Sequence, residues 1–239
     1  MRYLNRSLVI FILIVACVRL ATGLYARDFV RTLKSPSAFS GIVVNDAFKV
    51  NIHKGKIFEA KVYGTEADLK KVMMRVVGNN LEIRRIHTPM IGIRFEGVPR
   101  VEVTLPELKS VTMNGSGVIS SSDHFEGAKL SLVIAGSGNI SLSSVNYHQI
   151  IDVISGSGST MLSGMTSKLE VTLVGSGIFN GEKLKSIDAE ITITGSGEVR
   201  PNVSGILNAT ISGSGSIYYL GKPTVNRVIT GSGDVTSLK

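Results

Sequence analysis

The residues of this chain whose types could support chemistry do not form a recognisable catalytic pattern. The four histidines, His53, His87, His124 and His148, lie far apart and match neither metal-ligand nor catalytic-triad spacing. Serine recurs between two adjacent glycines, which is not the Gly-x-Ser-x-Gly elbow of a nucleophile, and no Gly-Lys-Ser/Thr follows to form a phosphate loop. We therefore predict that the chain is not an enzyme and has no catalytic, cofactor-binding or metal-binding residue.

Four charged residues keep two other interpretations open. Asp152 and Arg227 fall at positions that the repeat described below turns inward, where a charge must be paired or costs several kcal/mol. Because they lie about four repeats apart, we expect a local bulge or phase shift to turn them outward, with a small pocket as the alternative. Glu170 and Glu190 share one outward column on neighbouring repeats, about 5 Å apart, and could bind a cation or act as acid and base. The alternative function is therefore a carbohydrate-active enzyme on a parallel β-helix.

A repeat of about twenty residues predicts the elements that position these side chains. Gly-Ser-Gly triplets recur at spacings of 21, 20, 19, 20, 18 and 18 residues, which is typical of a stacked architecture. Glycine permits positive φ and close backbone approach, so each triplet is expected to form the same structural corner. The predicted corner residues are Gly115, Gly117, Gly136, Gly138, Gly156, Gly158, Gly175, Gly177, Gly195, Gly197, Gly213, Gly215, Gly231 and Gly233.

Between the triplets, apolar residues alternate with Ser, Thr and charged residues, which is the period of a strand and not of a helix. Two positions before each triplet the residues are Met113, Ile134, Ile154, Leu173, Ile193, Ile211 and Ile229. Four positions after its first glycine they are Ile119, Ile140, Thr160, Phe179, Val199, Ile217 and Val235. A short strand cannot bury its apolar face alone, whereas a stack of identical coils can. We predict an all-β fold, a single-stranded parallel β-helix (β-solenoid) with rungs of about 20 residues, and favour a right-handed coil.

Residues 39–114 lack the triplet but alternate in the same way, so we expect them to form the first rungs and a strand-rich N-terminal cap. Gly78-Asn79-Asn80 predicts a tight hairpin turn. Residues 68–74 fit either a short helix or the start of a strand. Residues 27–38 read as a linker, and 115–239 as the repeats of the same domain.

The first 26 residues have the pattern of an export signal. A basic start is followed by an uncharged run over residues 7–18, which is the length of a signal-peptide core and too short for a membrane-spanning helix. Leu24-Tyr25-Ala26 is a suitable cleavage site. Alternatively, residues 14–17 resemble the lipobox of bacterial lipoproteins, in which Cys17 would carry the lipid. Cys17 is the single cysteine, so no intramolecular disulfide can form.

The net charge of +8 is concentrated in one half of the chain. Residues 1–114 carry 18 Lys and Arg against 9 Asp and Glu, and residues 115–239 carry 8 against 9. We interpret the basic excess as a solvated surface, with an anionic surface such as lipid headgroups as the alternative. Nucleic acid is not expected as a partner because no recognition motif accompanies the charge.

The chain resembles the head GIN domain of putative auto-transporter adhesins over about residues 39–239. The resemblance rests on FSGIVVNDAFKVNI, on VEVTLPELKSVTMNGSG, on the repeated triplet and on the closing GSGSIYYLGKPTVNRVITGSGDV. It implies a β-helix of the bacterial envelope and adhesion by analogy, and it brings no catalytic residue.

We therefore expect a non-catalytic, exported, adhesin-like module of the bacterial periplasm, outer membrane or cell surface. Its flat polar faces would bind polysaccharide or a protein partner. Membrane contact would come only through the signal or a lipid anchor, no cofactor is expected, and homo-oligomerisation is left open.

Overall fold

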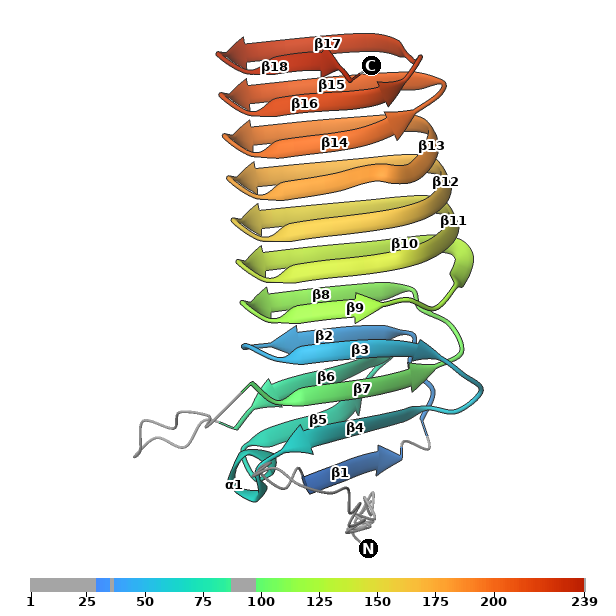
Figure 1. Cartoon of the computed structure of the whole chain (residues 1–239), viewed down its shortest axis with the longest axis vertical. Helices are drawn as coiled ribbons and strands as arrows, with labels where there is room; N and C mark the ends of the chain where they lie inside the picture. Colours follow the sequence, from blue (N-terminus) through green and yellow to red (C-terminus); the bar gives the residue numbers. More distant parts are fainter. Residues whose placement is uncertain (1–28, 35–36, 87–97, 239) are drawn as a thin grey trace, which may run out of the picture.

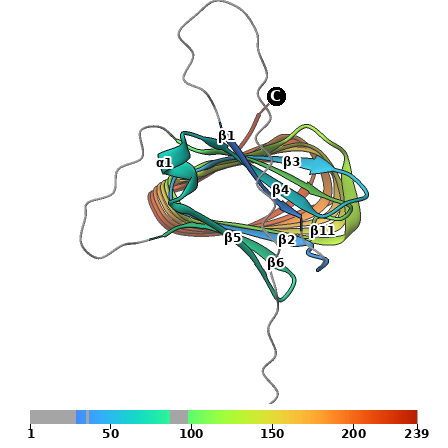
Figure 2. The same cartoon turned by 90° about the horizontal axis from the view of Figure 1, so that it is seen from below.

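A flattened coil of parallel strands, closed at one end by a smaller group of antiparallel strands, makes up the molecule (Figures 1 and 2). The computed structural model describes residues 29–34, 37–86 and 98–238. The Gly-Ser-Gly triplets form one edge of the coil, and a wider turn forms the opposite edge. We call these the Gly-Ser-Gly edge and the opposite edge.

The repeats form strands that stack in register, as predicted. Gly156, for example, is paired with Gly136 on one side and with Gly175 on the other. Three strands, β11 to β13, run from one corner around the opposite edge to the next corner. The strands of this part are β8 (Ser110–Gly115), β9 (Val118–Ser121), β10 (Phe125–Gly136), β11 (Asn139–Gly156), β12 (Ser159–Gly175), β13 (Ile178–Gly195), β14 (Glu198–Val203), β15 (Ile206–Gly213), β16 (Ser216–Gly221), β17 (Thr224–Gly231) and β18 (Asp234–Ser237).

Differences in repeat length are absorbed at the opposite edge. The register between neighbouring strands shifts at Leu142/Val145, Met161/Ser163 and Gly181/Lys185, and all three shifts lie near that turn. The Gly-Ser-Gly edge is regular by comparison, because the backbone N–H groups of each corner donate to glycine carbonyls of the preceding one, as Ser176 does to Gly156 at 3.0 Å. One edge is therefore uniform and the other varies from rung to rung.

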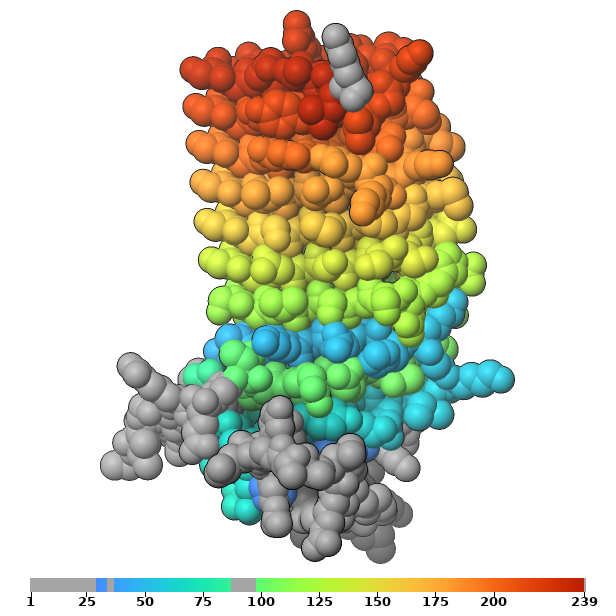
Figure 3. Space-filling model, in the orientation of Figure 1, coloured from blue at the N-terminus to red at the C-terminus, as the bar shows by residue number. Residues whose placement is uncertain are grey.

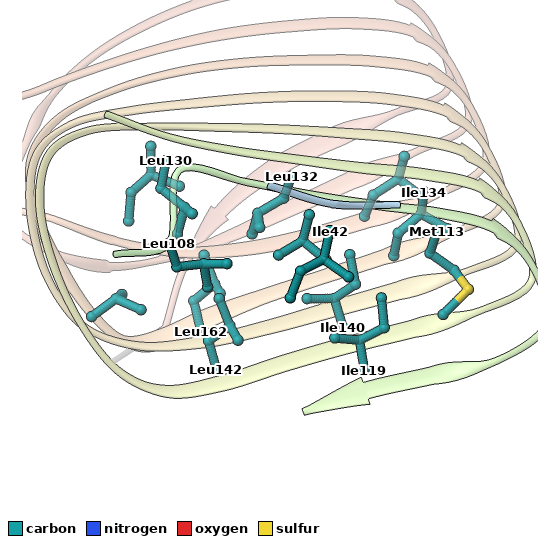
Figure 4. Close-up of a cluster of buried hydrophobic side chains, with 14 of the residues drawn as sticks. Ile42, Leu108, Met113, Ile119, Leu130, Leu132, Ile134, Ile140, Leu142 and Leu162 are labelled. Atoms are coloured by element: carbon teal, nitrogen blue, oxygen red, sulfur yellow. The ribbon is translucent and has the colours of Figure 1, made fainter. Parts of the chain in front are cut away.

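The core between the two long faces is filled by columns of aliphatic side chains (Figure 4). Leu130, Leu132 and Ile134 of β10 point toward Ile140 and neighbouring side chains on the facing wall. The columns predicted before and after each triplet are buried, except for Ile229 in the last rung, which is partly buried. Each fully buried aliphatic side chain contributes roughly 1.5–3 kcal/mol, so these columns supply most of the stabilisation.

The N-terminal elements do not stack in chain order. The rung formed by β2 and β3 lies between the rung of β6 and β7 and that of β8 and β9, since Gly41 is paired with both Asn80 and Ser110. Figure 3 shows this blue rung between two green ones. The elements are β1 (Phe29–Lys34), β2 (Gly41–Asn45), β3 (Lys49–Lys54), β4 (Glu59–Gly64), α1 (Glu66–Leu69), β5 (Val72–Val77), β6 (Asn80–Arg85) and β7 (Arg100–Leu105).

Antiparallel strands and a short helix close this end of the core. β4 pairs with β1 and β7, and β5 pairs with β6 across the predicted turn at Gly78, whose φ is +58°. Residues 68–74, which fitted either a helix or a strand, contain both the end of α1 and the start of β5. Residues 27–38 were expected to be a linker, but Phe29–Lys34 within them form β1, whose alternate side chains pack against β4 and the core.

Candidate functional site

The predicted corner glycines all lie at the Gly-Ser-Gly edge, and the two glycines of a triplet are needed for different reasons. Gly175 has a φ of +119°, and a Cβ there would lie 2.5 Å from the carbonyl oxygen of Gly156. Gly177 has no unusual φ, but a Cβ would lie 2.7 Å from both the Gly158 carbonyl and the Ile154 side chain. The serine between them is exposed. The triplet is therefore an architectural feature that leaves a column of hydroxyls on the surface.

Asp46 forms a corner that the sequence did not reveal. Asn45 is paired with Asn114, so Asp46 stands where the next rung has Gly115. Its φ is +87°, and its backbone N–H donates to the Asn114 carbonyl at 2.8 Å. Asp tolerates positive φ better than most residues do, which explains how this rung turns without a triplet.

Asp152 contradicts the expectation of a bulge that turns it outward. Its side chain is fully buried in the core, and the strand pairing runs through it without a shift, from Leu132 on one side to Val171 on the other. Oδ1 accepts a 3.2 Å hydrogen bond from the Thr160 hydroxyl, whereas Oδ2 has no hydrogen-bond partner among the described residues. Burial raises the pKa of Asp152 to about 7, and the bond from Thr160 opposes this rise only in part.

Arg227 is also in register rather than displaced by a phase shift, because it is paired with Ala209 in the same inward column. It is exposed because its rung is the last one described. Asp152 and Arg227 therefore do not meet among the described residues, because they lie on separate rungs of the same column.

Glu170 and Glu190 are neighbours on one outer face, as the spacing predicted. The carboxylate of Glu170 accepts a hydrogen bond from Gln149 at 2.8 Å and forms a 2.6 Å ion pair with Lys168. These contacts lower the pKa of Glu170, and the hydrogen bond from Lys168 has the largest effect. The carboxylate of Glu170 is therefore charged and paired with a lysine. This arrangement differs from that of a glycosidase acid, whose pKa must be raised.

The histidines occupy separate places. His53 Nε2 lies 2.6 Å from Glu102 and its Nδ1 lies 4.0 Å from Asp123, so both ring nitrogens face carboxylates. The nearby Ser120 hydroxyl donates to Asn51 Oδ1 at 2.6 Å and is not bonded to the imidazole. This cluster joins β7, β3 and the loop after β9, and it contains no base aimed at a serine. His87 falls outside the described residues.

A shallow groove crosses the opposite edge, where the register shifts. Its volume is about 670 Å³, and its lining comes from five successive rungs. Met165 and Ile187, which are each more than half exposed, provide its apolar surface. Lys185 and His148 add basic groups, and Glu126 lies at one end. The remaining lining residues are Gly127, Asn146, Tyr147, Thr166, Ser167, Ser186 and Ser204.

Buried hydroxyls fix the floor of this groove. Tyr147 turns inward and donates from its hydroxyl to the Leu108 carbonyl at 2.5 Å. Ser186 donates to the Asn202 carbonyl at 2.8 Å, and Thr166 donates to the Lys168 carbonyl at 3.0 Å. The floor is therefore preorganised, and exposed hydroxyl, amide and amine groups stand above it. The groove could not be predicted from the repeat, because the residue types in its columns change from rung to rung.

Several predictions concern parts of the chain without a described structure. The export signal and Cys17 lie among residues 1–28, which are outside the described residues. In the ranges described, no helix is long and apolar enough to cross a membrane. Within the same ranges, no group of three or more His, Cys, Asp or Glu side chains could hold a metal ion.

Comparison with known proteins supports the resemblance described above. The sequence model of the family described as "putative auto-transporter adhesin, head GIN domain" matches residues 38–223. No protein of curated function matches the chain.

Solved structures share the fold at low sequence identity. A putative adhesin from Bacteroides fragilis superposes with a TM-score of 0.83 at 19% identity, covering 90% of this chain and 98% of that one. A putative lipid-binding protein from Parabacteroides distasonis gives a TM-score of 0.72 at 23% identity, with 89% and 97% covered. A putative adhesin from the same species gives 0.69 at 19% identity, also with 89% and 97% covered. The β-helix fold is thus common to all three.

Proposed function

We propose a binding function for this chain, which belongs to the family described as "putative auto-transporter adhesin, head GIN domain". In this proposal it is an adhesin-like, non-catalytic module of the bacterial envelope that holds a polysaccharide chain in the groove of the opposite edge. The observation that carries the proposal is that this groove crosses five successive rungs and is lined by a different set of side chains on each.

The chemistry of the groove favours a polysaccharide over a flat protein surface. Hydroxyl and amide groups of the groove, such as the half-buried Ser167 and the exposed Ser204 and Asn146, exchange hydrogen bonds with sugar hydroxyls directly or through water. Met165 and Ile187 offer apolar surface to the C–H faces of the sugar rings. Because successive rungs are about 4.8 Å apart, a linear polymer lying along the stack meets a new set of groups at each step.

Export places the groove where such polymers occur. The basic start and the apolar run over residues 7–18 support passage out of the cytoplasm, to the periplasm, the outer membrane or the cell surface. The cap then follows directly after the signal, and Cys17, if acylated, would anchor the chain at that end.

Filling the groove tests the proposal. Ser167→Trp places an indole among the lining residues, and Ser157→Trp places the same indole at the exposed Gly-Ser-Gly edge of the neighbouring rung. Wild-type protein and both variants would be applied to immobilised bacterial envelope polysaccharides. We expect Ser167→Trp to bind at least tenfold more weakly than wild type and Ser157→Trp to bind unchanged.

Two results would contradict this assignment. If both variants bind like the wild type, the ligand lies elsewhere on the surface. If the wild type binds no polysaccharide but forms a cross-link to an envelope protein through Lys185, the partner is a protein.

A further inference from the structure

The last described rung leaves strand edges unpaired. β17 is hydrogen-bonded to β15, and β18 to β16, and within the described ranges neither has a partner on its other side. Figure 1 shows this rung at the end of the stack opposite the cap. An exposed edge of eight residues offers N–H and C=O groups to any strand that can pair with it.

The apolar core also opens at this end. Val225 and Ile229 are only partly buried, whereas Leu207 and Ile211, which precede them in the same columns, are almost completely buried. Val228 on the outer side is 64% exposed. Unpaired edges beside exposed apolar side chains are the features on which a second β-helix would dock.

Arg227 stands in the middle of this open surface. It follows Ala209 in the inward column that holds Leu132, Val171 and Ile191 in earlier rungs, where all three are buried. Burial of an unpaired guanidinium would cost several kcal/mol, and this rung is where it can still reach water. The pKa of Asp234 is lowered mainly by the hydrogen bonds that its carboxylate accepts from Thr236 and from the Val235 N–H. The positive charge of Arg227 lowers this pKa further. Arg227 thus lies in the inward column at this end of the core and is exposed to solvent.

The opposite end of the core is covered and does not offer the same surface. Val62 and Val72 are buried there beneath β1, α1 and the strands beside them. Arg31 occupies an inward position in β1, in register with Val62, and its guanidinium donates to the Val72 carbonyl on the other face. The guanidinium of Arg31 therefore bridges the two faces where the core is already closed.

We propose that Arg227 blocks stacking: it keeps the rung of β17 and β18 from docking on the same rung of a second copy of this chain. Without the arginine, two copies would meet about a two-fold axis, because each offers the same surface at the last described rung and the N-terminal elements cover the other end. β17 would pair with its counterpart in antiparallel orientation, and the product would be a closed dimer and not a fibre. Inward-pointing charges protect the edges of natural sheets by this means.

The experiment compares molar masses by light scattering on a sizing column, using the protein as purified after export. Arg227→Leu restores an apolar residue in the inward column, and Arg227→Ala reproduces the residue of the preceding rung. Arg227→Lys keeps the charge. Lys183→Leu is the matched control, because it removes one positive charge and adds one exposed leucine in the middle of the stack.

We expect Arg227→Leu to shift to twice the wild-type mass, with an association constant at least tenfold higher, and Arg227→Ala to shift in the same direction. Arg227→Lys and Lys183→Leu should keep the wild-type mass. Thermal melts establish that each variant is folded. If Arg227→Leu does not fold, Arg227→Ala takes its place as the apolar test variant. The proposal is wrong if both folded apolar variants keep the wild-type mass, if Lys183→Leu associates equally, or if Arg227→Leu forms open-ended polymers.

Discussion

Thr160 donates a 3.2 Å hydrogen bond to Asp152 across the core, from one long face of the β-helix to the other. Oδ2 of the same carboxyl group is buried without a hydrogen-bond partner among the described residues. Burial raises the pKa of Asp152 to about 7. The neutral carboxyl is therefore the form that suits the folded core.

This raised pKa makes stability depend on pH. The unfolded chain loses the Asp152 proton near its ordinary pKa of about 3.9, whereas the folded chain keeps it until about pH 7. The folded state thus binds more protons between these values, and the free energy of unfolding should fall as pH rises through this window. We expect a loss of up to about 4 kcal/mol, levelling off above pH 7. Urea unfolding at several pH values measures it.

Asp152→Val is the control for that pH dependence, since Val matches the aliphatic residues on either side in the column. The variant should be more stable than the wild type at pH 8, and its stability should change less between pH 4 and pH 7. Equal slopes for the two proteins would show that other groups cause the pH dependence.

Substitutions in the corner and the core should rank in a defined order. Gly175→Val forces a β-branched residue to a φ of +119° and against the Gly156 carbonyl, at a cost of roughly 1–3 kcal/mol or more. Gly231→Val meets the Gly213 carbonyl in the same way, but it should cost less because no described rung lies beyond it. Ile193→Asp should be worst, since it buries an unpaired carboxylate. Melting temperatures check the order, and a value for Ile193→Asp close to wild type would contradict the core assignment.

Asp46→Gly should stabilise the protein. Glycine adopts a φ of +87° without strain, so relief of the strained aspartate outweighs the greater entropy of the unfolded chain. We expect a gain of about 0.5 to 1 kcal/mol in the free energy of unfolding. Asp46→Ala keeps the Cβ and should give no gain. If Asp46→Ala stabilises the protein as much as Asp46→Gly does, the destabilisation at this position comes from the aspartate side chain and not from its positive φ.

Cys17→Ser separates the two modes of export. If cleavage occurs after Ala26, the variant should be processed and fractionated like the wild type, which is the result we expect. Gel mobility and cell fractionation provide the measurement. Accumulation of precursor together with loss of membrane association would instead establish acylation at Cys17.

The repeat made most of the stack predictable. Triplets at nearly constant spacing assign each residue to a column, so the burial of Ile193 and the pairing of Glu170 with Glu190 followed directly. The same reasoning failed at Asp152, because we assumed that a charged side chain in an apolar column would be turned out of the core. Neutralisation of the carboxyl and a bond from Thr160 allow it to stay.

Features without a period were not predictable. Asp46 makes its corner with no triplet, and the groove at the opposite edge lies where the register shifts and side chains differ from rung to rung. The position of the β2–β3 rung between later rungs depends on pairing between distant segments, which no local pattern encodes.

We expect that exchanged rung order to divide folding into two phases. The β2–β3 rung is synthesised before either neighbour, so its strands remain without partners until β6 to β9 are available. Because these long-range pairings close large loops, we expect the N-terminal unit to form slowly and cooperatively. Later rungs each add to a finished edge and contact only their neighbours. We therefore expect a molecule truncated from its C-terminus to shorten rung by rung, whereas one interrupted before β6 lacks any partner for its β2–β3 rung.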